Sequence, residues 1–149
     1  MARVLGIDFG ERRIGIAISD PTATIAQPLT VLTRRAGKRP PVQAIADLVA
    51  AHEVHHIVIG LPLTLAGDES DWTREVRAFG EKLEQRTGVG VSFADERMTS
   101  VAAERAVRSL GLRRREREQK ERVDAAAAII ILQAQLDRMK NDMNGHPGE

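Results

Sequence analysis

The stretch Val4-Leu5-Gly6-Ile7-Asp8-Phe9-Gly10, near the N-terminus, decides the fold. Apolar residues occupy both of its alternating faces, a pattern typical of a strand in the middle of a sheet. Asp8 stands where the apolar run ends, and an ionised carboxylate is costly to bury unless a cation or hydrogen-bond donors compensate its charge. From this stretch alone, Asp8 is either a turn residue that accepts backbone N–H bonds or part of a functional site.

Length and composition narrow the class of protein. A chain of 149 residues suits one domain with a substantial core. It has no cysteine, which excludes disulfides and Cys-ligated zinc. No signal peptide is visible before the first strand, and no apolar segment approaches the roughly 20 residues that span a membrane. We therefore expect a cytoplasmic protein that does not act at a membrane.

Positive charge gathers in two segments, although the formal net charge is only +1. The first comprises Arg34, Arg35, Lys38 and Arg39. The second comprises Arg113, Arg114, Arg115, Arg117, Lys120 and Arg122. We expect these segments to follow the backbone of a nucleic acid. The alternative is that they are solvated loops, and the glutamates interleaved with the second segment keep that alternative open.

The N-terminal part of the chain predicts an antiparallel meander. The first strand lies within residues 4–10, and further strands are expected at 14–19 and 25–32. Their short connections favour hairpins, and Pro28 places the third strand at an edge of the sheet, because proline cannot donate to a ladder.

Helices and strands alternate after the meander. In chain order we expect a helix from Pro41, a strand at 55–60, a helix capped by Ser70 or Asp71, a strand at 88–94, a helix from Thr99 or Ser100 to Gly111, and a last helix over about 121–139. A strand that follows a crossover helix is usually parallel to its neighbour. The prediction is an α/β domain over residues 1–140 with a mixed five-stranded sheet, three antiparallel strands and then two parallel ones, flanked by helices. Residues 141–149 are expected to form a disordered tail.

Acidic residues follow two of the predicted strands. Asp8 ends the first strand, and Asp95 and Glu96 end the fifth. If the fourth strand lies between these two, the acids start about 10 Å apart, and side chains can close that gap to the span of about 8 Å of a two-metal site. The longer Glu96 reaches inward better than Asp95. Each acid also has an ordinary alternative, an ion pair with Arg97 for example.

Asp124, in the first turns of the last helix, completes the acidic set. On its own it would merely complement the helix dipole. Together, several carboxylates at one sheet edge would repel one another unless a cation lies among them. Oxygen ligands without cysteine suit Mg²⁺ or Mn²⁺.

Four motifs, in the same order, resemble those of the YqgF/RuvX family. They are Asp8–Asp20, Val58–Leu63, Asp95–Ser100, and Val123-Asp124 with Ala127-Ala128 and Ile131-Leu132-Gln133. The resemblance covers residues 3 to 138. It implies an RNase H-like fold and relationship to pre-16S rRNA nucleases and Holliday junction resolvases. The chain departs from the family pattern at Thr64–Gly67, where the family often has an Asn and an Asp, and at Met98, where Leu is more usual.

The resemblance implies that Asp8, Glu96 and Asp124 are the catalytic, metal-binding acids, with Asp95 as a helper. Arg13 matches a basic position of the first motif. We expect contacts to nucleic acid from Arg13, Arg97, Thr99 and Lys120. The expected reaction is hydrolysis of a phosphodiester bond with Mg²⁺ or Mn²⁺, in processing of the 5′ end of pre-16S rRNA.

Three alternatives remain at this stage. The first is a resolvase that cuts branched DNA, which would need a symmetric dimer, so the oligomeric state is either monomer or homodimer. The second is an RNA-binding factor that acts in ribosome assembly or transcription without cutting. The third is an actin-like ATPase or sugar kinase, which the single domain disfavours because those enzymes build their site between two domains.

Overall fold

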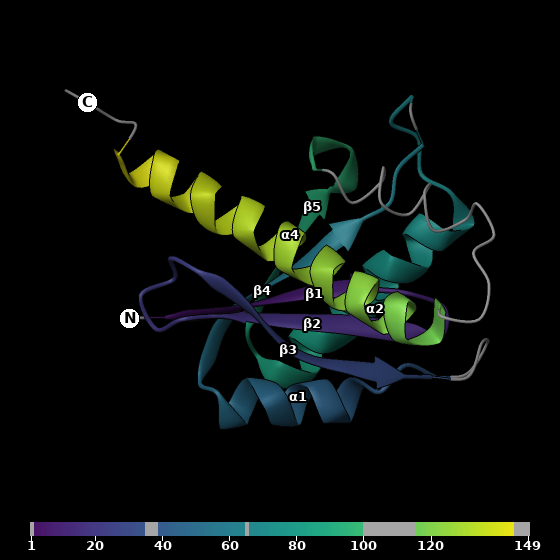
Figure 1. Ribbon diagram of the computed structural model, residues 1–149, viewed down its shortest axis with the longest axis horizontal. Coiled ribbons are helices and arrows are strands. Elements are labelled where there is room, and N and C mark those ends of the chain that lie inside the picture. The colour runs from purple at the N-terminus through teal and green to yellow at the C-terminus, as the bar shows by residue number, and fades with distance from the viewer. Residues whose placement is uncertain (1, 35–38, 65, 100–115, 145–149) are drawn as a thin grey trace.

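A computed structural model describes residues 2–34, 39–64, 66–99 and 116–144, and for 116–125 and 143–144 it describes the helical backbone alone. The elements in chain order are β1 (Arg3–Phe9), β2 (Arg13–Ser19), β3 (Ala26–Thr33), α1 (Val42–Ala51), β4 (Val54–Leu61), α2 (Asp71–Thr87), β5 (Gly90–Asp95), the 3₁₀ turn η1 (Glu96–Met98) and α4 (Glu116–Asn144). Figure 1 shows them together.

The five strands form one sheet in the order β3-β2-β1-β4-β5. β1 pairs with β2, and β2 with β3, in antiparallel fashion, whereas β4 is parallel to β1 and β5 is parallel to β4. This confirms the predicted mixed sheet. β1 is central and almost wholly buried, and Pro28 lies in the edge strand β3, where its missing N–H breaks no inner ladder.

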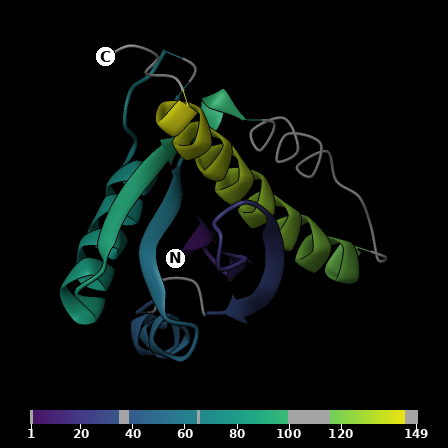
Figure 2. The ribbon, with the colours of Figure 1, turned by 90° about the vertical axis from the view of Figure 1, so that its left-hand side faces the viewer.

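Helices cover both faces of the sheet. α1 and α2 pack on one face, where β1 contributes Leu5, Ile7 and Phe9 to the larger apolar core. α4 crosses the other face and packs there against Val4 of β1 and Val58 of β4. Figure 2 shows α4 on one side of the strands and α1 and α2 on the other. Successive residues of a strand point to opposite faces, so Asp8 shares the α4 face with Val4.

Two glycines let α4 lie directly on the sheet. A Cβ atom on Gly6 would be 2.6 Å from Leu132 Cβ and 3.1 Å from the carbonyl oxygen of Ala128. A Cβ atom on Gly60 would be 2.5 Å from Ile131 Cδ1. The distances of 2.6 and 2.5 Å are shorter than any normal carbon contact, so the approach of α4 depends on the missing side chains.

The helix ends follow local sequence. Ser70 caps α2 as expected, and its side chain and that of Thr73 each accept the other residue's backbone N–H, at 3.2 and 3.1 Å. Gly88 ends α2 in the left-handed region, with φ +70°, so β5 begins at Gly90 and the predicted start of this strand at residue 88 is wrong.

The C-terminal helix is longer than predicted. α4 begins at Glu116 rather than near residue 121 and continues to Asn144, so part of the second basic segment is helical and residues 141–144 do not belong to a disordered tail. Favourable helix propensities beyond the apolar stripe account for the extension. The predicted helix between Thr99 or Ser100 and Gly111 lies outside the described residues. None of the described helices has the length and apolarity needed to cross a bilayer.

Candidate active site

Asp8 is a buried carboxylate at the carboxyl end of β1, on the face that α4 covers; the residue is 3% exposed. Across the antiparallel ladder it pairs with Gly15. The parallel ladder pairs Ile7 with Ile59, so Asp8 is level with Gly60 of β4. Gly15 and Gly60, the residues level with Asp8 on the two adjacent strands, have no side chains. They therefore leave space around the Asp8 carboxylate at the end of the central strand.

Glu96 is brought to the same place by the turn that follows β5. Its side chain folds back over β4, where Glu96 Oε1 is 2.8 Å from the position a Cβ on Gly60 would take. Glu96 is 4% exposed. Because Asp8 lies one strand from Gly60, about 4.8 Å away, the two acids are neighbours on the α4 face.

The burial of these two acids favours a cation. Like charges in one shielded site repel, and the low local dielectric strengthens both that repulsion and the attraction of a cation. An acid that only closes a turn has a different environment in this protein: it is exposed and accepts backbone N–H bonds. Asp20 is in an exposed turn, where the N–H groups of Ile25 and Thr24, at 2.9 and 2.8 Å, and the hydroxyl of Thr22 lower its pKa to about 2.

Asp95 lies beside Glu96 in sequence but is engaged by Arg97. Arg97 Nε is 3.1 and 3.0 Å from the two carboxylate oxygens, Arg97 Nη2 is 2.7 Å from Oδ2, and the backbone N–H of Arg97 donates to Oδ1 at 2.9 Å. These bonds lower the pKa of Asp95, with a smaller contribution from the charge of Arg138. Asp95 therefore orients the arginine in this structure.

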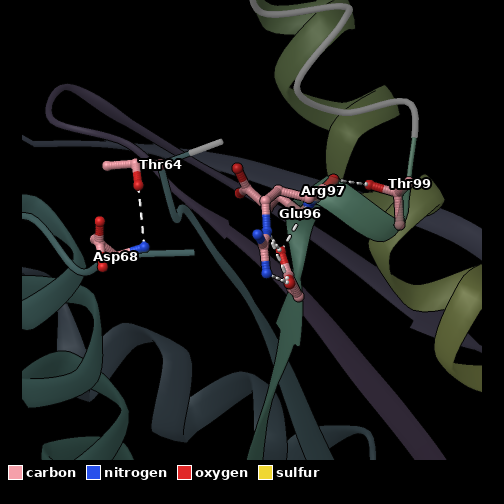
Figure 3. A network of polar contacts seen from close by, with 6 residues as sticks. Thr64, Asp68, Glu96, Arg97 and Thr99 are labelled. Carbon is pink, nitrogen blue, oxygen red and sulfur yellow. Dashed lines mark hydrogen bonds and ion pairs between the residues drawn. The ribbon is translucent and has the colours of Figure 1, made fainter. Parts of the chain in front are cut away.

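Arg97 also contacts the loop between β4 and α2. Its Nη1 is 3.1 Å from the position a Cβ on Gly67 would take, and Gly67 has φ +89°. The loop is closed by a bond from the N–H of Asp68 to Thr64 Oγ1, at 3.0 Å. Figure 3 shows Glu96 and Arg97 at the end of β5, with Thr64 and Asp68 of this loop on one side and Thr99 on the other. This loop is the one whose sequence departs from the family pattern.

We expect the variant Arg97→Lys to raise the pKa of Asp95 toward its ordinary value of 3.8, because lysine keeps the charge and loses the planar fork. A lowered carboxyl pKa stabilises the fold above the ordinary value, and this contribution disappears as pH falls through the lowered value. The melting temperatures of wild type and variant should thus differ near neutral pH and converge in acid. NMR titration of side-chain carboxyl carbons measures the pKa.

Arg74→Lys is the matched control for this variant. Arg74 pairs with Asp71 on the surface of α2, so this change should leave the Asp95 titration as it is in the wild type. An unchanged Asp95 titration in Arg97→Lys would contradict the role assigned to the guanidinium fork.

The other predicted site residues are distributed as follows. Arg13 begins β2 two residues before Gly15, the partner of Asp8, and so shares the α4 face with Asp8. Thr99 ends η1, where its hydroxyl donates to the Glu96 carbonyl at 3.0 Å. Asp124 and Lys120 lie in α4, where the backbone alone is described.

The donor set fits a divalent cation in part. Among the side chains that the structure describes, no group of three or more acids or histidines is arranged to hold a metal ion. Asp8 and Glu96 supply two adjacent sets of carboxylate oxygens, the donors that Mg²⁺ and Mn²⁺ prefer. A third acid would have to come from another element. Position 124 precedes Ala128, which touches Gly6, by about one helical turn.

The sequence interpretation missed the residues that shape the space around the acids. Gly60 makes room for the Glu96 carboxylate, and Gly6 sets the distance of α4. Glycine inside a strand is a known indication of close approach by another chain segment, and this signal was present at both positions.

Comparison with known proteins agrees with the sequence motifs. A family model described as RuvX, Holliday junction resolvase, matches residues 2–138. A protein of Chloroflexus aggregans is 44% identical, over 93% of this chain and 95% of its own length, and one of Koribacter versatilis is 42% identical, over 91% and 87%. Both are provisionally named as pre-16S rRNA nucleases.

Solved structures identify the fold. The complex of T. thermophilus RuvC with a Holliday junction substrate superimposes with a TM-score of 0.55 at 16% identity, and the match covers 94% of this chain and 97% of that one. A second Thermus thermophilus RuvC structure has a TM-score of 0.52, also at 16% identity, over 93% and 96%. These similarities confirm the RNase H-like fold.

Proposed function

We propose, from the premise that this chain belongs to the RuvX family, that it processes the 5′ end of pre-16S rRNA and depends on a divalent cation. Membership of that family makes it a nuclease, a hydrolase that acts on phosphodiester bonds. The observation that carries the proposal is the pair of buried acids, Asp8 and Glu96, at the carboxyl end of the parallel strands. The names of the relatives supply the proposed substrate, pre-16S rRNA. From this substrate we infer that the enzyme acts in the cytoplasm.

In this proposal Asp8, Glu96 and Asp124 hold the cation. Asp8 and Glu96 are positioned by the sheet and by Gly60, and Asp124 by the packing of α4 on Gly6. When bound, Mg²⁺ or Mn²⁺ supplies Lewis-acid stabilisation of charge on the phosphoryl oxygens and activates water for attack. Asp95, a helper in the sequence interpretation, keeps Arg97 oriented instead of joining the ligands.

Basic and polar residues around the acids bind the substrate. In this proposal Arg13, on the same face as Asp8, binds phosphate oxygens through two parallel N–H bonds. Arg97 carries its charge at the end of β5 and approaches the substrate with its fork already oriented. Thr99 and Lys120 extend these contacts along the nucleic-acid strand of the substrate.

A second candidate is a resolvase of branched DNA. The description of the matching family and the fold shared with T. thermophilus RuvC favour it. Symmetric cleavage of a junction requires two active sites related by a two-fold axis, and hence a dimer.

Cleavage assays decide between these candidates. We expect the protein to trim a 5′-extended 16S rRNA precursor with Mg²⁺ or Mn²⁺ and to lose this activity in EDTA. A four-way DNA junction is the parallel substrate, with size-exclusion chromatography to give the oligomeric state. Junction cleavage by a dimer, without RNA trimming, would replace the proposal by the resolvase. Tight RNA binding with no cleavage of either substrate would replace it by a non-catalytic assembly factor.

A further inference from the structure

A basic groove runs between α1 and α2, on the sheet face opposite the two acids. Its larger part has a volume of about 840 Å³ and lies between the segment that leads into α1 and the last turns of α2. A smaller hollow of about 210 Å³ shares Pro40 and Lys82 with it and extends to Phe9, at the end of β1, and to Arg34, directly after β3. We call the two together the α1–α2 groove.

Farther along α1, an adjoining hollow that shares Gln43 and Arg86 with the groove also carries Asp47 and Glu53, but the groove itself is positive. Its lining residues include four basic side chains and one acid: Arg34, Arg39, Lys82, Arg86 and Glu75. The first turn of α1, which forms one wall, has no acidic residue. On α2 the described salt bridges, Arg74 with Asp71 and Arg77 with Glu69, fall outside the groove lining. The groove therefore presents cations that suit a polyanion.

A basic path joins the groove to the active site. Arg13 shares the face of Asp8, and Arg12 stands at the tip of the turn between β1 and β2. Beyond the tip, the backbone N–H of Arg34 donates to the Arg12 carbonyl at 2.7 Å, and Arg34 Nε donates to the Glu11 carbonyl at 2.7 Å. The Arg34 guanidinium is thereby fixed 4.7 Å above the ring of Phe9, the residue after Asp8, at the mouth of the groove.

We propose that the α1–α2 groove binds the phosphodiester backbone of a single strand that continues from the scissile bond over the edge of the sheet. This rests on the proposed function for the origin of the strand. The aromatic rings at the mouth of the groove are not available to stack on bases of the nucleic acid. Phe9 and Trp72 stack on each other at 5.3 Å, and both lie under Arg34. The groove thus recognises phosphates and is indifferent to base sequence.

Charge reversal tests this surface without requiring cleavage. The variant combines Lys82→Glu with Arg86→Glu, and the control combines Arg74→Glu with Lys140→Glu, which changes the net charge equally at exposed positions outside the groove. The probe is a fluorescein-labelled oligouridine, with oligothymidine as the DNA arm. Fluorescence anisotropy is measured over a series of KCl concentrations in EDTA, which prevents cutting during the measurement.

We expect the groove variant to bind oligouridine about 10-fold more weakly at low salt, and the slope of log Kd against log[KCl] to fall by about 1.4, since each phosphate contact on a single strand contributes about 0.7. The control should remain within about 2-fold of wild type, and circular dichroism should show both proteins folded. An equal loss for oligothymidine would show that the phosphates alone are recognised, and a loss for RNA alone would narrow the partner to RNA.

The proposal that the groove binds a single strand would be overturned by either of two results. The groove variant and the control could bind oligouridine with equal affinity, or the wild type could fail to bind it. The result is separable from the proposed function. A wild type that trims precursor RNA but whose groove variant binds normally refutes the groove alone. A groove that binds oligouridine in a protein that cuts no RNA refutes the proposed function alone.

Discussion

Asp8→Asn protein is expected to fold and to bind RNA while its cleavage rate falls by roughly 10³-fold or more, about 4 kcal/mol of transition-state stabilisation. Asparagine keeps the shape of the side chain and removes its charge from the site that Asp8 shares with Glu96. The expected loss follows because a neutral amide is a much weaker partner for a divalent cation than a carboxylate is. Single-turnover cleavage of the 16S rRNA precursor measures the effect.

Thermal stability separates this role from that of an ordinary turn residue. Removing one of two adjacent buried like charges relieves repulsion, so without metal the melting temperature of Asp8→Asn should equal or exceed that of wild type. Mg²⁺ should raise the melting temperature of the wild type, because a ligand that binds only the folded state stabilises it, and should not raise that of the variant. A turn acid would show the opposite pattern, a lower melting temperature and an unchanged metal response.

Asp47→Asn is the control for the loss of one carboxylate. Asp47 is exposed on α1, away from the sheet edge, and its substitution should leave cleavage at the wild-type level. Cleavage by Asp8→Asn above a tenth of the wild-type rate would refute the assignment, as would equal losses of cleavage and RNA binding in a folded protein.

Gly6→Ala is expected to give the largest loss of stability among the substitutions considered, about 3 kcal/mol, the upper part of the range for overpacking a core. The new Cβ would be 2.6 Å from Leu132 Cβ, 3.1 Å from the Ala128 carbonyl oxygen and 3.3 Å from Leu132 Cα. None of these atoms is the flexible end of a side chain, so α4 itself has to move. Urea denaturation measures the free energy of unfolding.

The same substitution should reduce cleavage, because α4 carries Asp124 and the shift of the helix moves this acid relative to Asp8. Gly90→Ala, at the start of β5 in the same sheet, is the matched control. A Cβ there would lie 3.5 Å from His56 Nδ1, an ordinary contact, and the free energy of unfolding should change by less than about 0.5 kcal/mol. If Gly6→Ala were as stable and active as Gly90→Ala, the close packing of α4 on the sheet would not matter to the site.

Much of the fold could be predicted from local rules. Short runs of apolar residues located the strands, Pro28 placed β3 at the edge, and Ser70 capped α2. Errors occurred where two signals competed. Gly88 belongs to the end of a helix rather than to the start of a strand, because an αL glycine closes α2 before β5 can begin.

The site could be predicted less completely. Sequence motifs and strand ends pointed to the same acids, because carboxyl ends of parallel strands meet at one edge of a sheet. The ion pair with Arg97 was an alternative that the sequence left open for either acid, and side-chain geometry assigned it to Asp95. The α1–α2 groove, by contrast, combines segments some 40 residues apart, such as Gln43 and Arg86, joined by a hydrogen bond of 2.5 Å. No local pattern contains such contacts.

The amino-acid sequence by itself determined the class of the fold, the order of the first three strands and the strand ends at which acids occur, because periodicity, proline and short turns act over a few residues. Only the tertiary structure decided that Glu96 lies over Gly60 beside Asp8 while Asp95 is held by Arg97. The physical reason is that burial of the acids depends on neighbours across strands, and α4 can come close enough to cover the acids only where the sheet has glycine at positions 6 and 60.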